Sequence, residues 1–268
     1  MKPLCFELKN PIRQRLNVSL LTPHTLKNCS IADILELPIS LGYHEYPVKY
    51  LFNVTGEDTQ HIIFTNSCAL MDNIGHDHNG GYIEVQGDAG DYVGSYMRAG
   101  LLHVKGNVGR YAATGLRGGE VFIHGNAGDY LGAAQQGFLQ GMRQGRVIVT
   151  GNAGHYVGQR MRRGLIIVEG HVGMYCGAHM IAGTISLFGQ VGAYLGYGMR
   201  RGTLLLTHSP TSLPPTFKDN GDYDLLFLQL LKQDLVYPDC PARPTTNHVQ
   251  RFIGDSACAG KGEVLVFQ

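Results

Sequence analysis

The sequence has 268 residues, contains 37 glycines and no tryptophan, and carries a formal net charge of +1 at pH 7. A balanced charge provides no overall field that would attract nucleic acid or a membrane surface. Because the N-terminus has no apolar signal segment and no apolar run approaches about 18 residues, we expect a soluble, cytoplasmic protein. The cysteines form no C-x-x-C pair and are expected to be free, buried thiols.

Residues 1–60 precede the regular part of the sequence and are expected to form an N-terminal cap. CFELKN (5–10) and YPVKYLFNVTG (46–56) predict strands. Ser30 stands where it would cap a short helix over 31–37, which Pro38 ends. A stack of strands needs such a cap, because its last strand otherwise leaves backbone groups unpaired.

Residues 82–202 contain six tandem copies of one pattern: a short apolar run, Gly-x-x-Gly, a tyrosine and a closing glycine. The first glycine of each copy, here called the anchor glycine, recurs after 19, 19, 26, 19 and 19 residues: Gly87, Gly106, Gly125, Gly151, Gly170 and Gly189. A fixed period of this size is typical of an architecture of stacked turns. A degenerate copy precedes them over 61–81, with Asn73 in place of the tyrosine.

The residues two and four places before each anchor glycine are apolar, which indicates a strand with one buried face. A 19-residue copy is too short for a β-α-β unit of about 30 residues. We therefore predict an all-β fold, a right-handed parallel β-helix over 61–208 in which each copy forms one turn. The anchor glycines would lie at corners, where the backbone needs positive φ or close approach.

Equivalent residues of such a stack form columns. A tyrosine column should add roughly 0.5–1.5 kcal/mol per stacked pair: Tyr92, Tyr111, Tyr130, Tyr156, Tyr175 and Tyr194. A polar column follows the anchor glycines, and its side chains should bond the local backbone: Asp88, Asn107, Asn126, Asn152, His171 and Gln190.

An arginine column stands two residues before the closing glycines, and only Ile181 interrupts it: Arg98, Arg117, Arg143, Arg162 and Arg200, with Arg163 and Arg201 beside it. Like charges about 5 Å apart repel unless they are solvated or paired. The column is therefore either a solvated edge with nearby carboxylates or a contact surface for an acidic partner protein, which we favour. The third copy has seven extra residues within 131–145, either a tolerated surface loop or a binding loop with Phe138 as a contact.

Residues 209–268 are expected to form a C-terminal cap. Before them, TLLLTH (203–208) starts one more turn and stops. Apolar residues at helical spacing in 223–237 predict a helix of about 10–14 residues that seals the C-terminal end of the stack. GKGEVLVFQ (260–268) predicts a final strand.

Three groups of residues are candidates for chemical sites. The loop 71–80 has possible metal ligands, but neighbours on a strand point to opposite faces, so a polar cap loop is favoured: Asp72, His76, Asp77 and His78. Cys176 and His179 could form half a zinc site, yet Cys176 stands in a column of small apolar residues and is interpreted as core. AGKGE (259–263) lacks the spacing of a phosphate loop. We expect no catalytic, metal or cofactor site in this chain.

Motifs such as GNAGDYLG (125–132), GNAGHYVG (151–158) and MRRG (161–164 and 199–202), repeated in tandem over 62–207, resemble a glycine-repeat family. This family includes the C-terminal β-helix domain of the large subunit of glutamate synthase and the C subunit of formylmethanofuran dehydrogenase. DILELPI (33–39), the free-standing length and RFIGDSACAGKGEVLV (251–266) look like the C subunit. The moderate charge looks more like the version in the bacterial formyltransferase/hydrolase complex of methylotrophs.

The resemblance implies that other subunits perform catalysis: a metal-binding, amidohydrolase-like A subunit, a B subunit and a formyltransferase-like D subunit. The C subunit would hold this hetero-oligomer together. The complex would transfer a formyl group from tetrahydromethanopterin to a methanofuran-type carrier and release formate during formaldehyde oxidation. Zinc or another metal and the carrier would then belong to the partner subunits.

Three alternatives stay open. The chain could be the C subunit of an archaeal-type formylmethanofuran dehydrogenase, or a glutamate-synthase-like interface domain. It could also be an enzyme that acts on an anionic polymer bound along the arginines.

Overall fold

The computed structural model describes residues 1–238, 240–241 and 243–268. Its strands form one 13-stranded, largely parallel sheet in the order β15-β16-β17-β14-β13-β12-β11-β10-β9-β8-β6-β1-β5 and a small sheet in the order β4-β3-β2-β7. The helices of the described residues are short, the longest having eight residues. The prediction of an all-β fold is confirmed.

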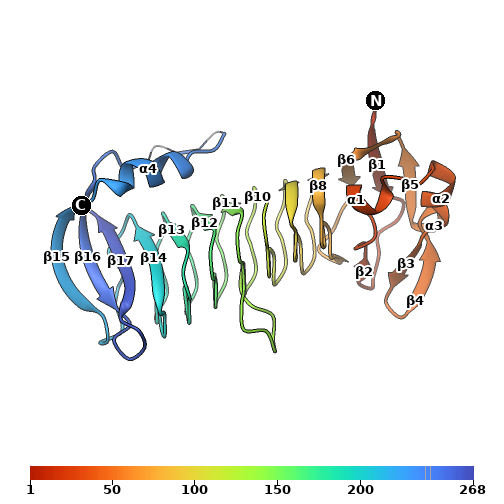
Figure 1. The fold of residues 1–268 in the computed structure, drawn as a ribbon. Helices are drawn as coiled ribbons and strands as arrows, with labels where there is room; N and C mark the ends of the chain where they lie inside the picture. The colour runs from red at the N-terminus through yellow and green to blue at the C-terminus, as the bar shows by residue number, and fades with distance from the viewer. Residues whose placement is uncertain (239, 242) are drawn as a thin grey trace.

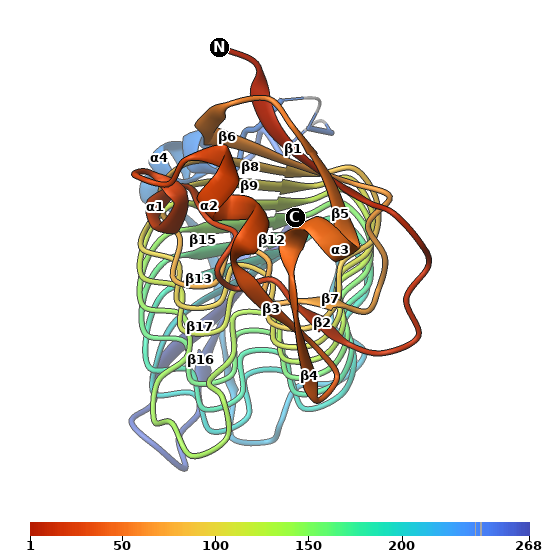
Figure 2. The ribbon, with the colours of Figure 1, turned by 90° about the vertical axis from the view of Figure 1, so that its right-hand side faces the viewer.

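Each copy of the repeat contributes one strand, and the strands lie side by side along the row seen in Figure 1. The six copies contribute β8 (Asn79–Val85), β9 (Ala99–Val104), β10 (Glu120–Ile123), β11 (Arg146–Val149), β12 (Leu165–Val168) and β13 (Thr184–Leu187), and β14 (Arg201–Leu206) begins the next turn. Equivalent residues pair in parallel, so Val121 lies between Leu102 and Val147. A second row of parallel bridges joins Val108 to Ala127 and continues to Val191. The chain therefore winds in stacked turns, which Figure 2 shows from the N-terminal end.

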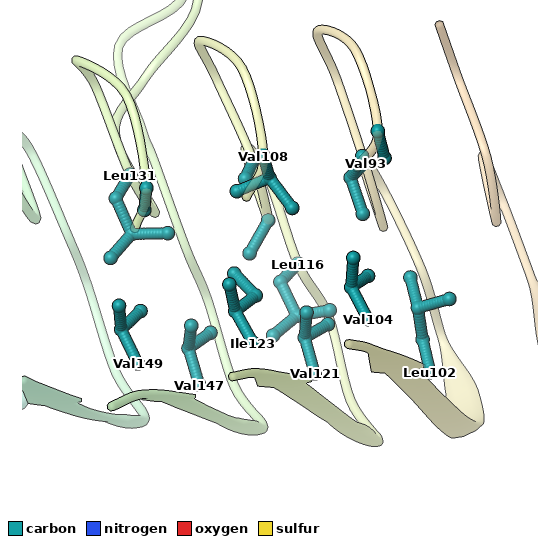
Figure 3. Packing of buried hydrophobic residues seen from close by; sticks show 14 of the residues in the cluster. Val93, Leu102, Val104, Val108, Leu116, Val121, Ile123, Leu131, Val147 and Val149 are labelled. Carbon is teal, nitrogen blue, oxygen red and sulfur yellow. The ribbon is translucent and has the colours of Figure 1, made fainter. Parts of the chain in front are cut away.

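The apolar residues two and four places before each anchor glycine belong to one core and have no exposed surface: Ile83, Val85, Leu102, Val104, Val121, Ile123, Val147, Val149, Ile166, Val168, Ile185 and Leu187. Figure 3 shows those of β9, β10 and β11 pointing into the stack. β-branched side chains suit this pleated packing. Because every turn places the same residue types at the same depth, the core runs without interruption from Phe6 to Val266.

The outward face of the middle strands is also buried, which the repeat pattern did not predict. Phe122, Ile148 and Ile167 point away from the interior, yet each is at most 5% exposed. Helix α4 (Phe227–Asp234) and the residues after it cover them through Leu228, Leu235 and Tyr237. Figure 1 shows α4 along the side of the stack. The prediction that a longer helix over 223–237 seals the end was therefore wrong in length and place.

Strands close the C-terminal end instead. β17 (Lys261–Phe267) pairs in parallel with β14 and continues the stack. β16 (His248–Gly254) and β15 (Lys218–Asp224) follow as antiparallel neighbours. The predicted final strand is confirmed, and it extends the row of parallel strands by one position beyond β14.

At the other end, β1 (Pro3–Leu8) pairs in parallel with β6 (Asp58–Thr65) and antiparallel with β5 (Phe52–Thr55). The predicted strand over 46–56 is interrupted by helix α3 (Val48–Leu51). The small sheet and two more helices complete this end: β2 (Leu16–Asn17), β3 (Pro38–Leu41), β4 (His44–Pro47), β7 (Met71–Asp72), α1 (Pro23–Leu26) and α2 (Ile31–Glu36). Ser30 caps α2 as predicted, because its Oγ accepts from Asp33 N and the Asp33 carboxylate accepts from Ser30 N.

Close approach, rather than positive φ, explains the anchor glycines from Gly106 onward. A Cβ on Gly170 would lie 2.6 Å from the carbonyl oxygen of Gly151 in the preceding turn. The closing glycines have positive φ angles and so, less expectedly, does every residue of the tyrosine column, where φ lies between 60° and 65°. Asn73 has the same conformation, with φ 62°, so residues 61–81 form a degenerate turn as predicted.

The polar column bonds the next turn rather than its own. The side chain of Asn107 accepts from Asn126 N at 2.9 Å, and that of Asn126 accepts from Asn152 N at 2.8 Å. Asn152 in turn accepts from His171 N at 2.7 Å. These bonds satisfy backbone groups at a corner where no strand partner is available.

We expect Asn152→Ala to lower the free energy of unfolding by about 1 kcal/mol, because His171 N loses its acceptor. Asn152→Asp keeps the oxygen and should stay near the wild type. Urea unfolding of both variants tests this expectation. Equal stability of the two variants would show that the bond contributes nothing.

Candidate partner interface

The backbone places the arginine column on one edge of the stack. Each arginine donates its N–H to the turn before it, as Arg117 N does to Met97 O and Arg162 N to Met142 O, both at 2.8 Å. A closing glycine with φ between 79° and 107° follows two residues later. The column and its two flanking arginines are all exposed: Arg98, Arg117, Arg143, Arg162, Arg163, Arg200 and Arg201.

This edge has more cations than anions. Arg98 forms a two-pronged pair with Asp77, with N–O distances of 2.8 and 3.1 Å. Among the described residues, no other arginine of the column has a carboxylate within ion-pair distance. Arg117 lies over the ring of Tyr96, and Arg162 donates to Gln140 Oε1 at 3.4 Å. Pairing with a local carboxylate is therefore seen only at Arg98 among the described residues of the column, and the other arginines are exposed to solvent.

The enlarged third turn, residues 131–145, leaves the stack at the same edge, as the green loop in Figure 1 shows. Gly141 N donates to Arg160 O at 2.9 Å, and Arg160 Nη1 donates to Phe138 O at 3.1 Å. These bonds tie the loop to the next turn. Its tip presents Phe138, which is 50% exposed, and Leu139, which is 78% exposed. The loop therefore adds apolar surface beside the arginines.

Two hollows flank this loop. One, of about 250 Å³, lies between the loop and the tyrosine column and is lined by Tyr111, Tyr130 and Phe138. The other, of about 380 Å³, lies on the C-terminal side and is lined by Leu139, Arg160, His179, Ile181, Arg200 and Cys258, among others. Burial, followed by the nearby Arg160 and Arg200 guanidiniums, lowers the pKa of His179. Arg160 stands outside the arginine column, so the repeat pattern did not single it out.

The tyrosine column forms a stack of parallel rings with centroids 4.7 to 5.3 Å apart and interplanar angles of at most 11°. Its rings are half-buried, and Tyr194 at the end is 50% exposed. The predicted stacking is confirmed, although the rings lie on the outside of the stack.

The residues considered for metal binding or catalysis are separated. Asp77 pairs with Arg98, His76 Nδ1 bonds Ser95 Oγ at 2.8 Å, and His78 is buried. Cys176 points into the core, where burial raises its thiol pKa to about 12, whereas His179 lies on the outer surface. All six cysteines are free, but only Cys176 is buried, so the expectation of buried thiols was wrong for the others.

No group of three or more histidine, cysteine, aspartate or glutamate side chains within the described ranges could hold a metal ion. In the same part of the chain, no helix has the length and apolar character required to span a bilayer.

Comparison with known proteins agrees with this architecture. The family model described as the GXGXG motif matches residues 73–220. No curated protein matches the chain. A chain in the crystal structure of the formyltransferase/hydrolase complex (FhcABCD) from Methylorubrum extorquens, in complex with methylofuran, is 33% identical to this chain and superposes with a TM-score of 0.91. The match covers 98% of this chain and 99% of that chain. This chain therefore belongs to the GXGXG-motif family and is homologous to a subunit of the formyltransferase/hydrolase complex.

Proposed function

We propose that this chain is the C subunit of a cytoplasmic formyltransferase/hydrolase complex and serves as its non-catalytic scaffold. The observation that carries the proposal is the match over nearly the full length of both chains at 33% identity. A likeness of this extent includes both ends of the chain, which the glutamate synthase alternative does not explain.

The proposed complex contains amidohydrolase-like A, B and formyltransferase-like D subunits. It would move a formyl group from tetrahydromethanopterin to a methanofuran-type carrier and release formate. The metal and the carrier would be held by the partner subunits. This chain would hold those subunits in position and would supply no catalytic residue. The separation of Cys176 from His179, and of Asp77 from His76, supports that division.

We further propose that the stack is a right-handed parallel β-helix that acts as a rigid support. In-register pairing from β8 to β14 and the second row of bridges support this assignment. Such a stack keeps the arginine column and the insertion at fixed separations along one edge. A partner can then bind both without the entropy loss of ordering a flexible surface.

The surface proposed for the partner is the arginine column together with the tip of the enlarged turn. Interfaces commonly combine exposed arginines with an apolar anchor, and Phe138 and Leu139 supply such an anchor. The excess of cations favours an acidic partner surface, because complementary charge steers association and fixes register.

Affinity purification of the tagged chain from its native cells tests the proposed function. We expect an amidohydrolase-like and a formyltransferase-like protein in the purified material. Recovery of a glutaminase-type partner instead would support a glutamate synthase role. Turnover by the isolated chain would contradict a non-catalytic scaffold.

The same purification tests the surface. Arg143→Glu combined with Arg162→Glu should reduce recovery of the partners at least about tenfold, because it places carboxylates opposite an acidic surface. The matched control is Arg110→Glu, since Arg110 is exposed but stands at another corner, beside Tyr111. The circular dichroism spectrum of each variant should match the wild type. Equal recovery with both variants would remove the arginine column from the interface.

A further inference from the structure

The larger hollow beside the enlarged turn has the features of a binding site. It has a volume of about 380 Å³ and is walled by three parts of the chain. Leu139 comes from the enlarged turn, Cys258 comes from the C-terminal loop, and Arg160, His179 and Arg200 come from three successive turns of the stack. Only the folded chain brings these residues together.

The backbone at two of its lining residues, Arg160 and His179, is strained. Arg160 and His179 occupy equivalent positions in consecutive turns, with φ of 55° and 54°. The equivalent residue of the first turn is Tyr96, with φ of 58°, and those of the second and sixth turns are Gly115 and Gly198, with φ of 62° and 68°. A residue with a side chain is less stable than glycine in this region, and such strain is commonly retained at functional sites. The turn therefore does not itself require these two side chains.

The charges around the hollow do not balance. Arg160 donates to the carbonyl of Phe138, and Arg200 has no carboxylate within ion-pair distance among the described residues. Asp255, a carboxylate whose charge acts on His179, is 3% exposed, and its two oxygens accept from Gly198 N and Ala257 N, each at 2.9 Å. Two guanidiniums against one carboxylate leave one positive charge when His179 is neutral. A single negative charge would neutralise the site.

The lining of the hollow also includes two aliphatic side chains. Ile181 interrupts the arginine column, and the fifth turn thereby presents an aliphatic side chain to the hollow where other turns present a guanidinium. Leu139 stands near it with 78% of its surface exposed. A pocket lined by both charged and aliphatic side chains favours a ligand that has a charged group and an aliphatic part.

We propose that this hollow binds a single carboxylate group carried on a short aliphatic chain. Arg160 and Arg200 hold the carboxylate, because guanidinium groups match carboxylate oxygens in charge and geometry. Ile181 and Leu139 contact the methylene groups. Two sources have this chemistry: a free aliphatic acid, and an aspartate or glutamate side chain of a partner protein. The second source rests on the proposed function, whereas the first does not.

Titration of the isolated full-length chain tests the chemistry. Sodium acetate, propionate and butyrate are added at constant ionic strength against sodium chloride, and the Nε–H signals of the arginines are followed by NMR. We expect saturable shifts for Arg160 and Arg200 but not for Arg110. Affinity should increase roughly two- to fourfold for each added CH₂ group, as burial of a methylene predicts. Shifts without saturation, or equal shifts with chloride, would overturn the proposal.

Variants separate binding from folding. Arg160→Gly introduces the residue that the second and sixth turns have at this position, so relief of the positive φ should offset the lost bond to Phe138 O and keep stability near the wild type, while butyrate binding weakens roughly tenfold. Arg200→Gln should weaken it by a similar factor, and Arg110→Gln should not. Ile181→Ala should retain acetate binding but lose the gain with chain length. Unchanged butyrate binding in Arg160→Gly would contradict the proposal.

The assembled complex distinguishes the two sources. Loss of partner recovery with Arg160→Gly and Arg200→Gln together, but not with Arg110→Gln, assigns the carboxylate to a partner side chain. Intact recovery together with butyrate binding to the complex assigns it to a free acid. If butyrate binds the isolated chain but the expected partners are not recovered, the proposed function fails and the carboxylate site stands.

Discussion

Replacing Gly170 by alanine is expected to lower the free energy of unfolding by about 3 kcal/mol, at the upper end of the range for overpacked interiors. The added Cβ would lie 2.5 Å from Asn152 Oδ1, 2.6 Å from Gly151 O and 2.7 Å from Gly151 C. Two of these atoms belong to the backbone of the preceding turn. They cannot move aside without disturbing the hydrogen bond from Gly170 N to Gly151 O.

Gly137→Ala is the control for this expectation. Gly137 lies in the enlarged third turn, where an added Cβ meets nothing within 4 Å, although its φ of 84° makes alanine unfavourable. The cost there should be only about 1 kcal/mol. Urea unfolding of both variants gives the comparison. If they lose the same stability, close approach of the turns is not what requires glycine at Gly170.

The second large effect is expected at Glu169, which fastens the C-terminal segment to the outer face of the sheet. Arg243 donates to both of its carboxylate oxygens at 2.5 and 3.0 Å, and Tyr237 donates to it at 2.7 Å. The Glu169 and Arg243 side chains are only 11% and 7% exposed, and Arg243 also lies 3.9 Å above the ring of Phe188. Burial and the bond to Glu169 raise the pKa of Tyr237.

Glu169→Ala would leave the Arg243 guanidinium buried without its partner, which costs about 3–5 kcal/mol. Because detachment lets the guanidinium reach water, we expect the segment over 225–237 to leave the sheet. This detachment would expose Phe122, Ile148 and Ile167. Hydrogen exchange in α4 and limited proteolysis should then increase sharply. The amides of the inward-facing strands should be affected much less.

Glu120→Ala provides the matched control. The pair of Glu120 with Arg146 is longer, at 3.2 Å, and both side chains are 26% exposed. Arg146 also retains its bond to the carbonyl of Val236 at 2.6 Å. The loss should be below about 1 kcal/mol, as for other solvated pairs. Equal effects of the two substitutions would mean that burial does not strengthen the pair at Glu169.

Much of the stack could be predicted from the sequence, because each turn contacts mainly the turn before and after it. Val121 pairs with Leu102 and Val147, and both pairs can be predicted from the spacing of the repeat. The same logic located the stacked tyrosines and the arginine column. It also located Asn73 in the degenerate turn, since one backbone conformation repeats wherever the pattern does.

The pattern could not predict contacts that the repeat does not contain. Apolar Phe122, Ile148 and Ile167 on the outward face were a sign that something covers it, because the first two turns have Glu84 and His103 there. The helical spacing near Leu228 indicated an apolar face. Periodicity shows which face of an element is apolar, but it does not show which surface that face packs against. The helix was therefore predicted at the C-terminal end of the stack, whereas α4 packs on the outward face of the sheet.

The candidate site also has one part that the sequence predicts and another part that only the structure shows. The sequence by itself determined the repeat, its inward face and the edge on which the arginines align, because these follow from short-range period and hydrogen bonding between neighbouring turns. Only the tertiary structure decided that the enlarged turn folds back on Arg160, that residue 258 returns beside His179, and that Ile181 faces a hollow. Those contacts join residues that do not occupy equivalent positions of the repeat. Their positions depend on how the enlarged turn and the C-terminal segment pack against the stack.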